Sequence, residues 1–185
     1  MSKSANKILE TAEQLFNKNS FTSVGVDLIR DESGCSKTTM YTYFKNKQQL
    51  VEEVLKQRDL HFRARLTQAL GTAEGSTAIE KIYDWHIQWF QTDHFKGCFF
   101  VRAVAESSSE DEQIQLISIA HKHWIRQLIH RHADPIAQNP LIGETIYLLI
   151  EGLISRFLVE GFDATIAMQQ RLIILQLLKN AQLLA

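Results

Sequence analysis

The residues whose types and spacing could do chemistry lie close together near the amino end, in the stretch SGCSKTTMYTYF at residues 33–44. This stretch combines a lysine with hydroxyl groups and two tyrosines, and no acidic residue occurs from residue 33 to residue 51. A solvated helix would favour Glu, Gln and Ala over Thr and Tyr, which are indifferent helix formers. Lysine and hydroxyl groups donate hydrogen bonds to phosphate oxygens, and methyl and aromatic carbons pack against thymine methyl groups. The stretch therefore predicts contact with a nucleic acid.

The same residues have the form of a helix-turn-helix, in which the second helix can lie in the DNA major groove. A short helix is expected to end at Ser33, where Gly34 suits a left-handed helix end and Ser36 is a good N-cap for the next helix. Met40 and Phe44, one turn apart, should face inward. The side chains then left outward are Ser36, Lys37, Thr38, Thr39, Tyr41, Thr42, Tyr43 and Lys47. Spacing alone leaves a solvated cap on a helical bundle as the alternative.

The rest of the chain offers little that indicates catalysis. Cys35 and Cys98 form no CxxC pair, and both are interpreted as small buried hydrophobic residues in a reducing compartment. Two pairs of histidines are each spaced by two residues, which points the members of a pair to different helix faces. We find no nucleophile with a base, no glycine-rich phosphate loop and no metal-ligand spacing. The sequence predicts no catalytic residue, no metal and no cofactor.

Hydrophobic periodicity predicts an all-α protein, because apolar residues recur at spacings of three and four and only two prolines and eight glycines occur in 185 residues. In the second helix, Val26, Leu28 and Ile29 are expected inward, and Ala133-Asp134-Pro135 should end the seventh helix. About nine helices are expected, near residues 4–18, 26–33, 36–44, 47–70, 77–92, 98–108, 111–132, 141–159 and 164–184. They divide into a three-helix head at 1–46, a connecting helix at 47–70 and a larger helical body at 71–185.

The formal net charge is only −1, and its distribution is uneven. Residues 1–58 carry nine Lys and Arg against seven Asp and Glu, whereas the remainder carries 11 against 14. This balance permits one local contact with an anion and argues against a protein coated in basic charge. No apolar run of about 18 residues indicates a membrane span, and the polar amino end does not resemble a signal peptide. The default expectation is a cytoplasmic protein with no membrane partner.

Residues 5–56 resemble the DNA-binding head of the TetR family (TetR/AcrR type) of bacterial transcriptional regulators. The resemblance lies in ILETAEQLF at 8–16, Phe21, VDLI at 26–29, GCSK at 34–37, TMY at 39–41, YF at 43–44, and Lys47 with Leu50. It implies a helix-turn-helix DNA-binding domain at 1–46 and a ligand-binding and dimerisation domain at 71–185. A twofold dimer would bind a pseudo-palindromic operator in double-stranded DNA.

The resemblance also implies roles for single residues of the helix expected near residues 36–44, which is the later of the two helices in the helix-turn-helix. Lys37 and Thr38 match positions near base edges. Tyr41 matches an aromatic residue that contacts the DNA backbone or a thymine methyl group. Thr42 is expected to face the groove or the phosphates.

Further positions match contacts with phosphate, which Thr39, Tyr43 and Lys47 are expected to make. The chain departs from the family pattern at three places. Tyr43 stands where histidine is common, Cys35 stands where valine is common, and Gly25 stands where a Ser or Thr commonly caps the preceding helix and holds a phosphate. At Gly25 only the backbone N–H remains for that contact, and one missing hydrogen bond costs about 0.5–1.5 kcal/mol.

The last two helices, at about 141–184, carry apolar residues over more than one face, which is more than a surface helix of a monomer exposes. The family resemblance implies that these helices form a homodimer. A buried central helix in a monomer is the alternative reading.

The family resemblance further implies a pocket in the body for a small-molecule effector, and aromatic residues with a few polar groups are suited to line one. For each single residue, a place in the hydrophobic core is the favoured reading over a place in a pocket, and the sequence does not identify the effector. The candidate ligand-binding residues are Trp85, His86, Trp89, Phe99, Arg102, His121, Trp124, Tyr147 and Glu151.

These observations predict a homodimeric transcriptional repressor that a small molecule releases from its operator. One alternative is a DNA-binding regulator that responds to a protein partner or to a redox signal at Cys98. A helical enzyme that uses Glu106 and Glu151 as paired carboxylates is the other alternative.

Overall fold

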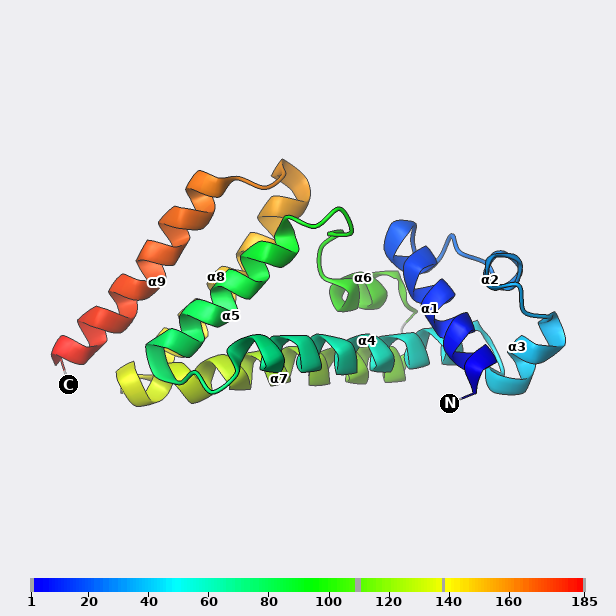
Figure 1. The fold of residues 1–185 in the computed structure, drawn as a ribbon, viewed down its shortest axis with the longest axis horizontal. Helices are drawn as coiled ribbons and strands as arrows, with labels where there is room; N and C mark the ends of the chain where they lie inside the picture. The colour runs from blue at the N-terminus through cyan, green and yellow to red at the C-terminus, as the bar shows by residue number, and fades with distance from the viewer. Residues whose placement is uncertain (1, 109–110, 138, 185) are drawn as a thin grey trace. The chain divides into compact units, whose positions relative to one another are not determined.

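The structure is a computed structural model that describes residues 2–108, 111–137 and 139–184. Those residues form nine helices and no strand, which confirms the predicted all-α fold (Figure 1). The helices are α1 (Lys3–Lys18), α2 (Val26–Ser33), α3 (Lys37–Tyr43), α4 (Lys47–Leu70), α5 (Gly75–Phe90), α6 (Phe99–Glu106), α7 (Glu112–Ala137), α8 (Pro140–Glu160) and α9 (Ala164–Leu184).

The chain divides into two compact units that alternate along the sequence. Unit 1 comprises residues 1–62 and 98–121, and unit 2 comprises residues 63–97 and 122–185. Helices α4 and α7 therefore each contribute to both units, and α6 belongs to unit 1 together with α1, α2 and α3. The predicted division of function between residues 1–46 and residues 71–185 stays a prediction.

The core of unit 1 forms where α1, α2 and α3 pack together beside the first turns of α4 (Figure 1). The hydroxyl of Ser2 caps α1 by accepting the Ala5 N–H at 3.2 Å. The ring of Phe21 lies between those of Phe16 and Phe99, with centroids 5.0 and 4.8 Å away, so α6 completes this core. The buried residues of α1 share one face of the helix and are Ala5, Ile8, Leu9, Ala12 and Phe16.

Helix α2 buries fewer apolar side chains than the sequence predicted. Ile29 is fully buried and Val26 is half-buried, but Leu28 is 41% exposed. The prediction that Leu28 faces inward was therefore wrong. Ile29 and Ser33 are spaced by four and define the buried face, and residue 28 lies about 100° away from Ile29 around the helix.

Helix α7 does not end at Ala133-Asp134-Pro135, as the sequence predicted, but continues to Ala137 with Pro135 inside its last turn. A proline removes one backbone hydrogen bond from a helix. Here Ala133 and Ala137 are buried, and Ile136 lies against Gly75 at the start of α5. Packing within unit 2 therefore holds the last turn helical in spite of the proline.

Unit 2 contains α5, α8 and α9, which contact one another and lie side by side in Figure 1. The Tyr83 hydroxyl donates to the Ala167 carbonyl at 2.6 Å and joins α5 to α9. Arg171 of α9 pairs with Glu80 and Asp84 of α5 at 2.6 and 3.0 Å. Among the described residues, no helix is both long enough and apolar enough to span a membrane.

Candidate nucleic-acid interface

Local interactions set the turn between α2 and α3. Gly34 adopts a φ of +62°, the left-handed conformation that the sequence predicted for it. The Ser36 hydroxyl accepts the Thr39 N–H at 3.0 Å, which confirms Ser36 as the N-cap of α3. Met40 and Phe44 are buried, also as predicted. The two helices and their turn form a helix-turn-helix.

With Met40 and Phe44 inward, the opposite face of α3 is open to solvent. Lys37, Thr38 and Thr42 are exposed, and Thr39 is half-buried. Tyr41 and Tyr43 are 47% and 39% exposed, although burying an aromatic ring is normally favourable. A surface that exposes two such rings beside a lysine is suited to a large polar partner.

The hydroxyl groups of α3 already make local hydrogen bonds. The Ser36 and Thr39 hydroxyls lie 2.8 Å apart, and whichever one donates, the other keeps its proton for a further acceptor. The Thr42 hydroxyl donates to the Thr38 carbonyl at 2.9 Å, so Thr42 must rotate before it can donate to a phosphate. The Ser36–Thr39 pair is thus the better placed donor.

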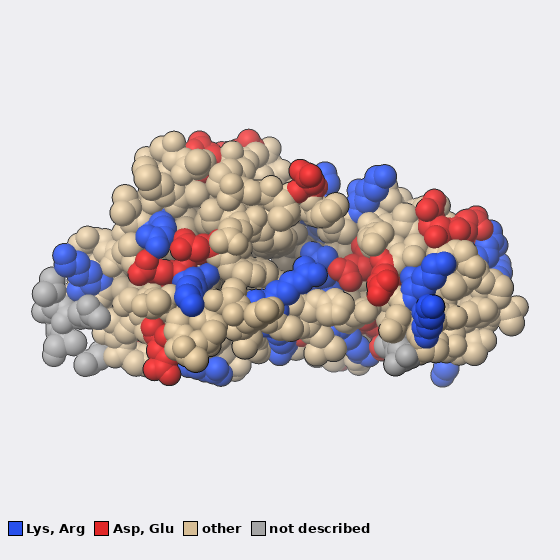
Figure 2. Space-filling view, in the orientation of Figure 1, with Lys and Arg blue, Asp and Glu red and all other residues tan. Residues whose placement is uncertain are grey.

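Acidic residues of α2 lie close to α3. Lys37 Nζ is 3.9 Å from Asp27 Oδ1. Arg30 pairs with Asp27 at 2.9 Å and with Asp31 at 2.7 Å, and so offsets the charge of both carboxylates. The spacing of three between Asp27 and Arg30 is a signal that could have revealed this pair. Figure 2 shows both signs of charge on the visible face of unit 1, with no wide basic field.

Gly25 is the N-cap residue of α2, with φ −83° and ψ 160°, and no side chain caps the helix there. A Cβ added at Gly25 would meet no atom within 4 Å. The backbone conformation is one that any residue adopts. No contact with another described residue therefore requires glycine at this position.

A capping arrangement places Lys47 in the first turn of α4. The Asn46 side chain accepts the Gln49 N–H, and the Gln49 side chain accepts the Lys45 N–H, both at 2.8 Å. Lys47 is half-buried, and its Nζ donates to the Thr22 carbonyl at 3.4 Å. Burial lowers the pKa of the Lys47 ammonium, and the negative charge of Glu106 offsets part of that shift.

Two side chains of α6 hold the segment between α1 and α2, and sequence reasoning missed this role for both. The Arg102 guanidinium donates to the carbonyls of Phe16, Asn17 and Asn19 at 2.6–3.1 Å and so caps the carboxyl end of α1. Glu106 Oε2 accepts the N–H and the hydroxyl of Thr22 at 3.0 and 3.2 Å. The partners are more than 80 positions apart in the sequence, so no local pattern could have revealed them.

The candidate ligand-binding residues are divided between the units: Phe99, Arg102 and His121 belong to unit 1, and Trp85, His86, Trp89, Trp124, Tyr147 and Glu151 belong to unit 2. In unit 1, Phe99 lies in the core, and Arg102 caps α1. His121 is buried, stacks on Phe100 at 3.6 Å and lies 2.7 Å from Asp59.

In unit 2 the structure brings Trp85, His86 and Trp89 together on α5, with ring centroids 5.1 to 6.4 Å apart. Phe95 extends this group, since its ring lies 5.1 Å from that of Trp89. The other three candidates lie elsewhere in unit 2: Trp124 faces the Arg63 guanidinium, Glu151 accepts from Lys122, and Tyr147 is half-buried on α8. As ligand contacts, all of these residues stay predictions.

The predicted alternatives gain no support from the site geometry. Cys98 is buried at the start of α6, and Cys35 is half-buried in the turn. Glu106 and Glu151, the carboxylates considered for an enzyme, belong to different units and pair with Thr22 and Lys122 respectively. No group of three or more His, Cys, Asp or Glu residues suited to a metal ion occurs among the described residues.

The amino-terminal region of the chain is similar in sequence to known proteins. Residues 8–54 match the family described as bacterial regulatory proteins, tetR family. An uncharacterised HTH-type transcriptional regulator of Mycobacterium tuberculosis is 39% identical over 46 residues. That match covers 25% of this chain and 23% of the relative.

Solved structures with the same fold extend over nearly the whole chain. A TetR-family transcriptional regulator from Streptomyces coelicolor superposes with a TM-score of 0.86 at 22% identity, over 98% of this chain and 97% of that protein. The reduced form of NemR from E. coli gives a TM-score of 0.80 at 18% identity, over 95% and 97%. At these identities the likeness shows a shared fold. Residues 8–54 thus match the tetR family of bacterial regulatory proteins in sequence and form a helix-turn-helix, and the chain as a whole shares the fold of TetR-family transcriptional regulators.

Proposed function

We propose that this protein is a homodimeric transcriptional repressor that binds a pseudo-palindromic operator and is released from it by a small molecule. The observation that carries the DNA contact is the exposed face of α3, where Lys37, Tyr41 and Tyr43 lie outward in a helix that contains no acidic residue. Lys37 and Thr38 would reach base edges. Thr39, Tyr43 and Lys47 would contact phosphates, with Tyr41, Thr42, Ser36 and the Gly25 N–H beside them.

An apolar stripe on α8 and α9 supports the dimer. On α8 the residues 141, 145, 148, 152, 155 and 159 recur at spacings of three and four and so share one face. Leu141, Leu148 and Val159 are 70%, 58% and 82% exposed on that face, and Gly152 has no atom near its Cβ position. Leu172 and Met168 of α9 are also more than half exposed. A second copy of the chain would cover this stripe, with small residues letting two helices approach closely.

The aromatic group of Trp85, Trp89 and Phe95 supports an effector of apolar or aromatic character. Half-buried rings offer a large apolar area and edge and face contacts for another ring. Suppose that an effector binds the conformation that cannot bind DNA about a hundredfold more tightly than it binds the DNA-binding conformation. This preference would shift the equilibrium between the two conformations by about 2.7 kcal/mol.

The direct test is selection of duplexes from a genomic DNA pool by the purified protein, followed by titration of a selected duplex at several salt concentrations. We expect a twofold-symmetric site and an affinity that falls steeply with salt. Failure to retain any duplex at low salt would refute the proposal. A library of apolar and aromatic compounds, assayed for thermal stabilisation and for release of the duplex, tests the effector part separately.

A further inference from the structure

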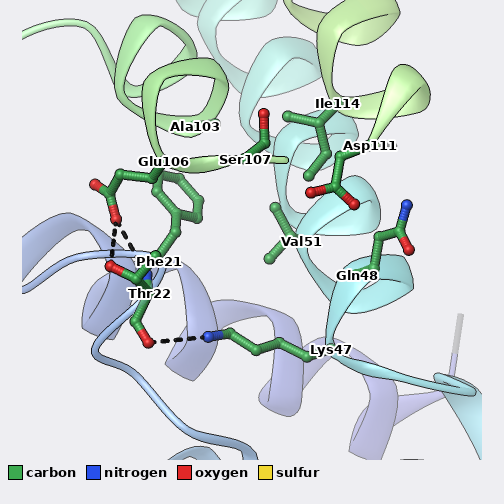
Figure 3. A pocket seen from close by; sticks show the side chains of 10 residues that line it. All are labelled: Phe21, Thr22, Lys47, Gln48, Val51, Ala103, Glu106, Ser107, Asp111 and Ile114. Atoms are coloured by element: carbon green, nitrogen blue, oxygen red, sulfur yellow. Dashed lines mark hydrogen bonds between the residues drawn. The ribbon is translucent and has the colours of Figure 1, made fainter. Parts of the chain in front are cut away.

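An open pocket in unit 1 contains a chain of three polar residues from three different segments (Figure 3). Lys47 enters from the start of α4 and Glu106 from the end of α6, and Thr22 lies between them on the segment that joins α1 to α2. The Thr22 carbonyl accepts from Lys47, while the N–H and hydroxyl of Thr22 donate to Glu106. A cation and an anion therefore act on the same residue from opposite sides.

We propose that Glu106 is a positioning residue that restrains Lys47 in the DNA-free protein, so that α6 carries an internal competitor for a phosphate-binding lysine. This inference rests on the proposed function, because it assigns Lys47 to a DNA phosphate. A phosphate and the Glu106 carboxylate are both anions, so the charge of Glu106 repels a phosphate that approaches the Lys47 ammonium.

The contacts give Glu106 two separable effects. Its charge attracts the Lys47 ammonium, and its oxygen fixes the Thr22 backbone by accepting two hydrogen bonds. The charge opposes phosphate binding, whereas the hydrogen bonds order the segment from which Thr22 presents its carbonyl. Removing only the charge and removing the whole side chain should therefore change DNA affinity in different ways.

Glu106→Gln separates the two effects, because an amide oxygen still accepts from Thr22 but carries no charge. We expect Glu106→Gln to bind a duplex, selected by the wild-type protein from a random pool, about two- to fivefold more tightly at low salt. The gain should fade as salt screens the charges. Hydrogen exchange at the Thr22 amide should stay as slow as in wild type with Glu106→Gln and become faster with Glu106→Ala.

Two controls make the test specific to Lys47. Asp111→Asn removes a negative charge from the wall of the same pocket, but Asp111 is held by the Ser108 N–H and hydroxyl at 2.8 and 3.1 Å and does not contact Thr22. It should change affinity much less than Glu106→Gln does. In a Lys47→Ala background, Glu106→Gln should give no gain, because the cation on which it acts is absent.

The inference is overturned if Asp111→Asn raises DNA affinity as much as Glu106→Gln does, or if Glu106→Gln still raises affinity in the Lys47→Ala background. It is also overturned if Glu106→Gln weakens DNA binding while the midpoint of thermal unfolding stays unchanged. In each of these cases wild-type protein still binds the duplex, so the proposed function survives. If the wild-type protein and every variant retain no DNA, the proposed function fails and the inference fails with it.

Discussion

Helices α3 and α9 both leave large side chains in solvent, but the chemistry of the two surfaces is opposite. The α3 face carries tyrosines, hydroxyl groups and a lysine, whereas α9 exposes Leu172, Ile173 and Met168. The first surface can remain hydrated and bind a charged polymer through water and ions. The second is stabilised only when another apolar surface removes it from water. Exposure alone does not indicate a partner, because exposed apolar side chains are common on protein surfaces. The chemistry of the exposed side chains indicates which kind of partner each surface suits.

The largest effect on operator affinity is expected from changes to the apolar surface of α8 and α9. Combining Leu148→Glu with Leu172→Glu places charges in the α8–α9 stripe and should convert a dimer into monomers, because a buried unpaired charge is costly. Operator affinity should then fall about a hundredfold or more, since two linked heads bind far better than one. Sedimentation velocity and duplex titration measure the two changes. Gln169→Glu, which adds the same charge to α9 without removing an apolar side chain, should remain dimeric; a monomer in that control would show that charge alone is responsible.

The next largest effect on operator affinity is expected from Lys37→Ala on the exposed face of α3. Loss of a contact to a base edge should cost about 1–3 kcal/mol of operator binding and relax base preference at one position of each half-site. Competition titrations against duplexes that vary at single base pairs report both changes. Lys45→Ala removes an exposed lysine just outside α3 and should leave the base preference intact. Wild-type preference in Lys37→Ala would contradict the placement of Lys37 at base edges.

A smaller effect is expected from Lys47→Ala, which should weaken all sequences about equally. Removal of one phosphate contact should reduce the slope of log affinity against log salt by about one. The same variant should leave the dimer unchanged, because Lys47 is not one of the residues of the proposed α8–α9 stripe. Titrations at four or more salt concentrations determine the slope. An unchanged slope would remove Lys47 from the set of phosphate contacts.

The smallest expected effect is a gain from Gly25→Ser. A Ser hydroxyl at the N-cap of α2 should raise the free energy of unfolding by a few tenths of a kcal/mol, because the backbone there already has an extended conformation and open space. If DNA reaches this position, operator binding should also improve, by about 0.5–1.5 kcal/mol. Chemical denaturation and duplex titration measure the two separately. Gly34→Ser is the contrasting variant and should destabilise the protein, because Gly34 has a positive φ.

Much of unit 1 could be predicted from the sequence because its determinants are local. Apolar spacing predicted the helix near residues 4–18, and the hydroxyl of Ser36 and the conformational freedom of Gly34 predicted the turn before α3. These features depend on residues within about four positions of one another. The exposed face of α3 followed directly, since burying Met40 and Phe44 leaves the other side chains outward.

Only the tertiary structure decided the features that join distant segments. Leu28 faces solvent because Ile29 and Ser33 take the buried side of α2, and α7 continues past Pro135 because Ala133, Ile136 and Ala137 pack within unit 2. Arg102 caps α1, and Glu106 holds Thr22, across more than 80 residues of sequence. The sequence by itself determined the helices and the chemistry of their exposed faces, because helix formation and capping are short-range. The tertiary structure decided which side chains hold the helix-turn-helix in place, because that depends on which distant carbonyl and N–H groups the folded chain brings within hydrogen-bond reach.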